Sequence, residues 1–369
     1  MVHAGYFSLV LEEKGMNSVI KLLRLVQTFL KGWFYMHIPD NYLSPSTCAV
    51  LATAMIPVWT TAIKKVKEEI TSSKMPLLGI GAAFTFLIMM FNVPLPGGTT
   101  GHAVGGTLLA ILLGPWAACI SLTVALLIQA LLFGDGGILA FGANCFNLAF
   151  VLPFTGYFIY QFIKERVTSE RGEYIGMALG SYLGINVSAL CAAIEFGLQP
   201  LLFKSAAGLP LYSPYPLAIS IPSMVIPHIL VAGFVEVVFT VAIVVFIKKA
   251  SPGAIYAGPK HKIKPVYGLL AALICLSPLG LLASGTAWGE WSVEEIKDVV
   301  SGGQALGYVP PGMEQGFSFA AVLPDYTFHG LPDVAAYILS AVAGVAVLLI
   351  IFKILGLSKN KTGAYPDER

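Results

Sequence analysis

A series of long apolar segments, separated by short loops rich in lysine, proline or glycine, most constrains how this chain can fold. Of its 369 residues, 56% are hydrophobic and only 11% are charged, whereas soluble domains carry about 25% charged residues. An apolar segment of about 20 residues spans the hydrocarbon core of a bilayer as a helix. The sequence therefore predicts an all-α polytopic membrane protein.

The charge pattern and the absent motifs exclude several other classes of protein. The formal net charge is +2 and no basic patch has interleaved aromatic side chains, so we expect no nucleic-acid partner. The chain has no Walker A loop, no GxGxxG and no HExxH, and hence no recognisable nucleotide site of its own. Its 5 cysteines lie within or beside apolar segments without CxxC spacing, which favours a packing role.

Lysine and arginine residues give the topology, because cytoplasmic loops carry an excess of both. They collect in 64–74, 164–171, 248–264 and 353–361. If all these stretches lie on the cytoplasmic side, the chain must cross the membrane an odd number of times between Val93 and Lys164. Only two apolar blocks are obvious in that interval. The break at Gly114-Pro115-Trp116 divides the first block into a short helix and a full one, which restores the parity.

This parity predicts nine membrane spans, seven in a substrate-binding bundle and two in a C-terminal domain. The expected spans are about 46–63, 76–92, 102–113, 115–133, 138–163, 174–198, 221–247, 266–283 and 334–355.

The expected domains follow from these spans. The bundle covers 36–250, and a cytoplasmic linker, 251–264, leads to a two-helix domain, 265–357. Within that domain the acidic patch 284–333 is expected outside the membrane. The remaining residues, 358–369, form a cytoplasmic tail.

Residues 1–35 are predicted to precede the true start of the protein and not to be translated. They lack the basic n-region and the cleavage site of a signal peptide. The segment 19–35 contains three basic residues and is too short to span, so an interfacial helix is the alternative. Lys31-Gly32 permits a ribosome-binding sequence upstream of an ATG at Met36, which favours a start at that residue.

Met36, His37 and His102 are the candidate metal ligands. If Met36 is the first residue, its α-amine, the His37 amide nitrogen and the His37 imidazole can close fused five- and six-membered chelate rings. His102 follows the next apolar segment, after the glycine-rich stretch 97–101. An amine, an amide nitrogen and two imidazoles make a planar set that suits Ni(II) or Cu(II) and is open to Co(II). The alternative is that each histidine is structural or solvated.

Four polar residues inside the spans are candidates for the outer shell of such a site. His228 and Glu236 lie eight residues, or two turns, apart on one helix and should share a face. Asn92 and Gln129 are intramembrane amides, which also serve simply to join helices. Asp135, between glycines, is expected to form a tight external turn.

Several motifs occur in order within 36–250. They are Met36-His37-Ile38-Pro39-Asp40, Gly97-Gly98-Thr99-Thr100-Gly101-His102, Leu112-Leu113-Gly114-Pro115-Trp116-Ala117, Gln129-Ala130-Leu131-Leu132-Phe133 and Gly142-Ala143-Asn144. Together they resemble the CbiM/NikM family, the substrate-specific membrane subunits of energy-coupling-factor cobalt and nickel transporters. Residues 260–357 resemble, less closely, the CbiN or PDGLE-type two-helix subunit of these systems.

The resemblance implies a function and partners. The chain would bind Ni²⁺ or Co²⁺ through Met36, His37 and His102 in the plasma membrane of a prokaryote, without enzymatic activity of its own. Import would need a transmembrane coupling subunit and ABC-type ATPase subunits, which other chains supply.

Two other functions stay open from the residues alone. An intramembrane metalloenzyme would need an open metal position and a general base. A secondary metal transporter would show repeat symmetry or an ionisable relay across several helices. Neither pattern is visible, and the sequence does not separate nickel from cobalt.

The topology predicts that a cysteine placed at Ser301 lies outside the cell. An impermeant thiol reagent added to intact cells should label it, because 284–333 is expected on the side opposite all the basic loops. Labelling that appears only after lysis would contradict the nine-span topology.

Overall fold

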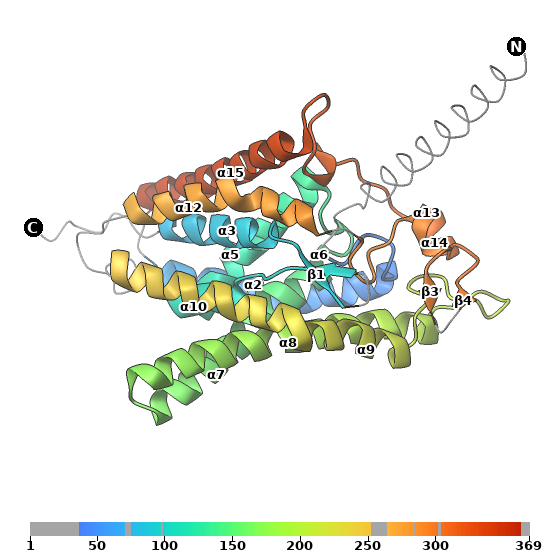
Figure 1. The fold of residues 1–369 in the computed structure, drawn as a ribbon, viewed down its shortest axis with the longest axis horizontal. Helices are drawn as coiled ribbons and strands as arrows, with labels where there is room; N and C mark the ends of the chain where they lie inside the picture. The colour runs from blue at the N-terminus through green and yellow to red at the C-terminus, as the bar shows by residue number, and fades with distance from the viewer. Residues whose placement is uncertain are drawn as a thin grey trace, which may run out of the picture.

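The structure is a computed structural model that describes residues 37–70, 75–96, 99–251, 264–283, 285–301 and 304–362. The extension 1–35, Met36 and most of the predicted linker lie outside the described residues. Helices run side by side in an elongated bundle, with the small elements α13, α14, β3 and β4 gathered at one end (Figure 1).

The helical elements alternate with short irregular stretches. In chain order they are α2 (Pro45–Glu69), α3 (Met75–Met89), α4 (Gly106–Leu113), α5 (Pro115–Ile128), η2 (Gln129–Phe133), α6 (Phe141–Asn144), η3 (Cys145–Val151), α7 (Leu152–Arg166), α8 (Glu170–Leu202), α9 (Leu217–Pro227), η4 (His228–Ala232), α10 (Gly233–Ala250), α12 (Lys264–Leu276), η5 (Ser277–Leu282), α13 (Val293–Ile296), α14 (Pro311–Glu314), η6 (Pro324–Tyr326) and α15 (Asp333–Thr362).

Within the described part of the chain, 7 helical segments are long and apolar enough to cross a membrane. They are Pro45–Glu69, Pro115–Phe133, Phe141–Arg166, Glu170–Leu202, Leu217–Ala250, Lys264–Leu282 and Asp333–Leu357. The prediction of a multi-pass helical membrane protein is therefore confirmed. The other two predicted spans, 76–92 and 102–113, coincide with α3 and α4, which have only 15 and 8 residues.

Local sequence signals set the helix ends. Ser44 caps α2 by accepting a 3.1 Å hydrogen bond from the Thr47 N–H, with Pro45 in the first turn. Gly114, at φ 87°, separates α4 from α5, and Pro115 begins α5, as the sequence predicted. The predicted start of the short helix at His102 is wrong, because α4 begins only at Gly106.

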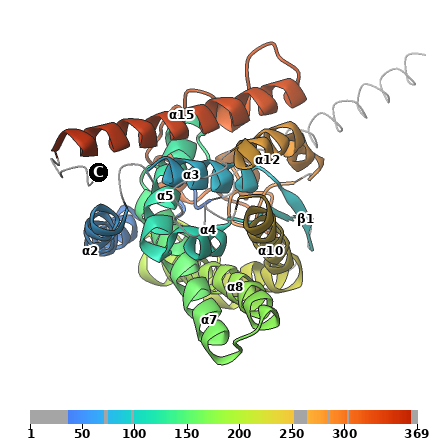
Figure 2. The same ribbon diagram turned by 90° about the vertical axis from the view of Figure 1, so that its left-hand side faces the viewer.

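Helix α3 is the central element that both domains share. Of its residues, all but Pro76 and Leu77 are buried, which fits a helix that is apolar on every face. In Figure 2, α15 and α12 lie on the outer side of α3, with α5 on its other side. A Cβ added at Gly344 of α15 would lie 2.2 Å from the Phe86 ring of α3, so the two helices pack closely. The two C-terminal helices are thus part of one continuous core.

Two short antiparallel hairpins interrupt the helical fold and were not predicted from the sequence. The strand β1 (Val93–Leu95) pairs with β2 (Thr99–Gly101), and β3 (Val300–Ser301) pairs with β4 (Gln304–Ala305). The β1–β2 hairpin brings the chain from α3 back into the bundle and ends directly before His102.

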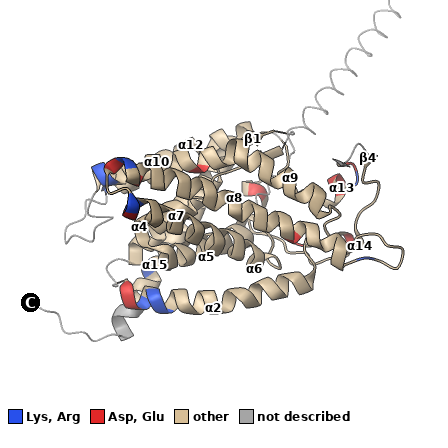
Figure 3. Cartoon of the chain, turned by 90° about the horizontal axis from the view of Figure 1, so that it is seen from below, with Lys and Arg blue, Asp and Glu red and all other residues tan. Residues whose placement is uncertain are grey.

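Most lysine and arginine residues lie at one end of the bundle (Figure 3). This end contains the C-terminal ends of α2, α7 and α10. Lys248 of α10 there forms an ion pair with Glu173 of α8. The elements α13 and α14, which carry Glu294, Glu295 and Glu314, lie at the opposite end.

Candidate metal site

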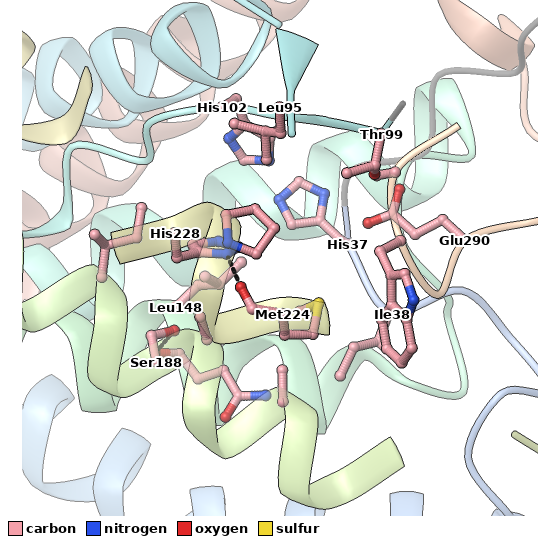
Figure 4. A pocket seen from close by; sticks show the side chains of 18 of the residues that line it. His37, Ile38, Leu95, Thr99, His102, Leu148, Ser188, Met224, His228 and Glu290 are labelled. Atoms are coloured by element: carbon pink, nitrogen blue, oxygen red, sulfur yellow. Dashed lines mark hydrogen bonds between the residues drawn. The ribbon is translucent and has the colours of Figure 1, made fainter. Parts of the chain in front are cut away.

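A cavity of about 100 Å³ lies where the two predicted histidine segments meet helices α8 and α9. Its ionisable lining residues are His37, His102, His228 and Glu290, and the rest of the lining is mostly apolar. Figure 4 shows the His37 ring between His102 and the Glu290 carboxylate. A small, largely apolar cavity with a few converging polar groups is typical of a ligand site.

His37 and His102 come together although they are far apart in the chain. Their ring centroids are 5.4 Å apart, with the ring planes at 60°. Both residues are buried, with 3% and 8% of their surface exposed. Two imidazoles that bind one ion through nitrogens at about 2 Å have centroids roughly 4 to 6 Å apart. The structure therefore brings two of the three predicted ligands to within reach of one metal ion, while Met36 lies outside the described residues.

The segment after His37 is fixed by side chains rather than by regular structure. The Asn144 amide accepts a hydrogen bond from Ile38 N at 2.9 Å and donates one to Ile38 O at 3.0 Å. The Asp40 carboxylate accepts from the N–H groups of Ile138, Leu139 and Ala140. Burial raises the pKa of Asp40, and these three hydrogen bonds offset part of that rise. The two loops are thereby held in one fixed position.

Asp135 lies behind His37 in the tight turn that the sequence predicted, but its carboxylate is buried. Its flanking glycines have positive φ angles of 70° and 85°. The carboxylate accepts hydrogen bonds from His37 Nδ1 at 2.9 Å, Tyr326 Oη at 2.5 Å and Gln129 Nε2 at 3.2 Å. Burial raises the pKa of Asp135, but His37 and the Tyr326 hydrogen bond outweigh this effect and hold it below its ordinary value.

The two ring nitrogens of His37 have different surroundings. Nδ1 meets Asp135, whereas Nε2 is buried and has no hydrogen-bond partner among the described residues. His102 Nδ1 lies 2.8 Å from the Ala103 carbonyl oxygen. An imidazole held on one side by a carboxylate or carbonyl is typical of histidines that bind metals through the other nitrogen.

His228 and Glu236 lie on the same helical segment, Leu217–Ala250, but have different hydrogen-bond partners. His228 lines the cavity, with Nδ1 2.7 Å from the Met224 carbonyl oxygen (Figure 4). Glu236 instead accepts from Val104 N at 2.7 Å and Gly105 N at 3.0 Å, at the N-terminus of α4.

The two predicted intramembrane amides have different positions. Gln129 contacts the site indirectly, since its amide donates to Asp135 and to Tyr326 Oη, both at 3.2 Å. Asn92 is not among the residues that line the cavity, and its amide makes no hydrogen bond to a described residue. His37 therefore has Asp135 as its direct partner with Gln129 behind it, and the Asn92 amide makes no hydrogen bond to either among the described residues.

The C-terminal domain covers the cavity. Thr99 and Thr100 of β2 donate hydrogen bonds to the carbonyls of Thr286 and Gly285, at 3.2 and 3.3 Å. Tyr42 donates a 2.6 Å hydrogen bond to the Trp291 carbonyl. We call the segment between these contacts, residues 285–291, the cover segment. Sequence reasoning missed it, because contacts between distant segments leave no periodic signal.

Glu290 of the cover segment projects its carboxylate into the cavity beside His37 and Thr99 (Figure 4). Burial raises the pKa of Glu290 well above its ordinary value, and the nearby Asp135 carboxylate adds to the rise. No group of three or more His, Cys, Asp or Glu side chains within the described ranges is close enough to hold a metal ion. A metal bound to the two histidines therefore needs further donors, such as backbone or terminal nitrogens.

The fold and the site together define a multi-pass helical membrane protein with a buried pair of histidines in a covered cavity. Residues 37–254 match the CbiM family, described as the cobalt uptake substrate-specific transmembrane region. Residues 264–361 match the PDGLE domain. The chain belongs to the CbiM family, a family of transport proteins, and the predictions of an uptake subunit and of no enzymatic activity are confirmed.

Relatives share the fused arrangement of the two regions. The chain is 54% identical to a probable fused nickel transport protein, LarMN, of Lactiplantibacillus plantarum, over 86% of this chain and 97% of the relative. It is 43% identical to the fused nickel transport protein NikMN of Rhodobacter capsulatus, over 85% and 95% of the two chains. The crystal structure of a truncated transition metal transporter is similar at 57% identity and a TM-score of 0.55, covering 58% of this chain and 99% of that one.

The Asp135 contacts predict unequal effects of removing two buried tyrosine hydroxyls. Tyr326→Phe removes a hydrogen bond to a carboxylate, which is worth about 1.5–3 kcal/mol, whereas Tyr337→Phe removes one to the neutral Met90 carbonyl, worth about 0.5–1.5 kcal/mol. The thermal unfolding midpoint in detergent should fall further for Tyr326→Phe. Equal falls in the two variants would contradict the assigned role of Tyr326 at Asp135.

Proposed function

We propose that the chain binds Ni²⁺ or Co²⁺ on the outer face of the plasma membrane of a prokaryote and imports it as the substrate-binding subunit of an energy-coupling-factor transporter. A transmembrane coupling subunit and ABC-type ATPase subunits would supply the energy. Membership of the CbiM family supports the transport role, and the two fused nickel transport proteins among the relatives favour nickel as the ion.

The ligand set that we propose is the Met36 α-amine, the His37 amide nitrogen and imidazole, and the His102 imidazole. The observation that carries it is the 5.4 Å approach of the two buried rings at one cavity. Four nitrogens in one plane suit Ni(II) and exclude ions that prefer oxygen ligands. His228 also lines the cavity and could replace a ligand only if the His37 chelate did not form.

Chelation requires one movement in this site. A six-membered ring with its own amide nitrogen uses His37 Nδ1, which here meets Asp135. Turning the ring about its Cβ–Cγ bond would free Nδ1 for the metal and direct Nε2–H towards the Asp135 side. Asp135 would then support the metal-bound imidazole, the carboxylate–histidine–metal arrangement found in many metal sites.

The proposed topology has nine crossings and the domains expected from the sequence. The helix α3 and the short α4 would count as crossings that neighbouring protein surrounds. This fits the burial of 13 of the 15 residues of α3 and 5 of the 8 residues of α4, and the Glu236 cap on α4. Residues 36–250 would form the metal-binding bundle and 265–357 the two-helix domain. The patch 284–333 would then cover the cavity from outside.

His102→Ala should abolish tight metal binding, whereas His329→Ala should not. His102 lines the cavity, but His329 is exposed and is not among the residues that line it. Loss of an outer-shell partner already costs 10–100-fold in affinity, so loss of a ligand should weaken binding by more than about 100-fold. Isothermal titration of both purified variants with Ni²⁺ and Co²⁺ measures this. Unchanged affinity in His102→Ala would remove the central ligand of the proposal.

The functional polypeptide should begin at Met36. A terminal amine, with an ordinary pKa of about 7.7–8.0, yields its proton to a metal far more readily than a peptide amide does. Native protein should therefore begin with Met36-His37, and one alanine inserted between these residues should abolish tight binding. N-terminal sequencing of active protein checks the start. A sequence that begins at residue 1, or unchanged affinity after acetylation of the amine, would contradict the amine chelate.

A further inference from the structure

Glu290 lies at the boundary between two cavities. The inner cavity, of about 100 Å³, contains His37 and His102. The outer one, of about 420 Å³, is lined by Asp40, Glu290 and two more acidic residues, Glu294 and Glu314. None of the described residues that line the outer cavity is a lysine or an arginine. Glu290 is the only ionisable residue that lines both cavities in the described part of the chain.

The Glu290 side chain is buried without a complete set of partners. Only 8% of the residue is exposed, and its Oε2 atom makes no hydrogen bond to any described residue. In Figure 4 the carboxylate points towards the histidines and not away from the cavity. A buried carboxylate oxygen without a donor is costly to folding, which indicates a function that keeps it there.

The backbone of the cover segment fixes this direction. Gly289 has a φ of 84°, and the Glu290 N–H donates to the Ala287 carbonyl at 3.1 Å, which forms a tight turn. Trp288 and Trp291 on either side of Glu290 both pack against the Tyr215 ring. Because both neighbours are anchored, the Glu290 side chain has little freedom to turn away from the cavity.

An acidic outer cavity attracts cations, since clefts lined by one sign of charge raise the local concentration of the opposite ion. A divalent ion that moves inward from it must lose water ligands. The free-energy cost of losing each one is small only when another donor atom can take its place. A carboxylate oxygen at the boundary can replace the first water and offset part of the ion's charge. The imidazole nitrogens of His37 and His102 can then replace the carboxylate.

We propose that Glu290 is a transient ligand that transfers the divalent metal ion from the outer cavity to the histidine site. This inference rests on the proposed function and adds a residue of the C-terminal domain to it. A permanent role as a ligand fits the structure less well, because Glu290 and the two histidines do not form a cluster of ligating geometry among the described side chains. A transient ligand must raise the rate of binding more than the final affinity.

The test compares metal-loading rates of the purified full chain. Glu290→Gln keeps the shape of the side chain but removes the carboxylate that the ion would contact. The matched control, Asp298→Asn, removes a charge from an exposed residue of the same external region that lines neither cavity. Trp288 lines the inner cavity, so quenching of tryptophan fluorescence by Co²⁺ in a stopped-flow instrument can follow loading.

The association rate for Co²⁺ should fall at least about 10-fold in Glu290→Gln, in line with the 10–10³-fold effect of local charge on ion capture, and stay near wild type in Asp298→Asn. The dissociation rate, measured with excess chelator, should stay within about 3-fold of wild type in both. An unchanged association rate overturns the proposal. A dissociation rate that rises alone also overturns it, because Glu290 would then be a permanent ligand. A different result would contradict the proposed function itself, namely equal association rates for Co²⁺ in wild type and His102→Ala.

Discussion

Irregular backbone inside a helical membrane bundle needs hydrogen-bond partners, because lipid offers none. Both histidine segments of this protein are irregular, and buried polar side chains satisfy them. Asn144 holds the backbone beside His37, and Glu236 holds the backbone that follows His102. Gln199 likewise accepts from Ser44 N at 2.9 Å, directly before α2 begins. The position of both histidines therefore depends on intramembrane carboxylates and amides, and removal of either kind of group would displace the segments that carry the site.

The same dependence joins the C-terminal domain to the site. Tyr326 comes from that domain and donates to Asp135, which in turn contacts His37. Tyr326 also stacks on Phe133, with the ring centroids 4.6 Å apart. The stacking fixes the ring, and the hydrogen bond to Asp135 fixes the hydroxyl. The cover segment adds a second connection through β2. Since both connections end at a histidine segment, the fused domain completes the cavity, and fusion in one chain keeps the two parts in equal amounts.

Much of the fold was predictable because its signals are local. Apolar length and the Gly114-Pro115 pair identify the helices and the break between α4 and α5, and the basic stretches of the sequence come together at one end of the bundle. Contacts between distant segments leave no such signal, so the β1–β2 hairpin and the Asp135–Tyr326 contact were missed. The separate partners of His228 and Glu236, the Met224 carbonyl and the N-terminus of α4, likewise left no local signal.

The arrangement of charges explains how such a site can select its ion. Moving a divalent ion into a low-dielectric interior is costly unless negative charge lies nearby. With the proposed nitrogen ligands, Asp135 supplies that charge from behind His37 without contacting the metal. Oxygen ligands in the first shell would favour Mg²⁺ and Ca²⁺, which are far more abundant in most surroundings. A nitrogen first shell with carboxylates behind it keeps the electrostatic stabilisation while the donor atoms favour Ni(II) and Co(II). A carboxylate that contacts the ion only during its passage, as proposed for Glu290, fits this arrangement because it adds capture without adding a permanent oxygen ligand.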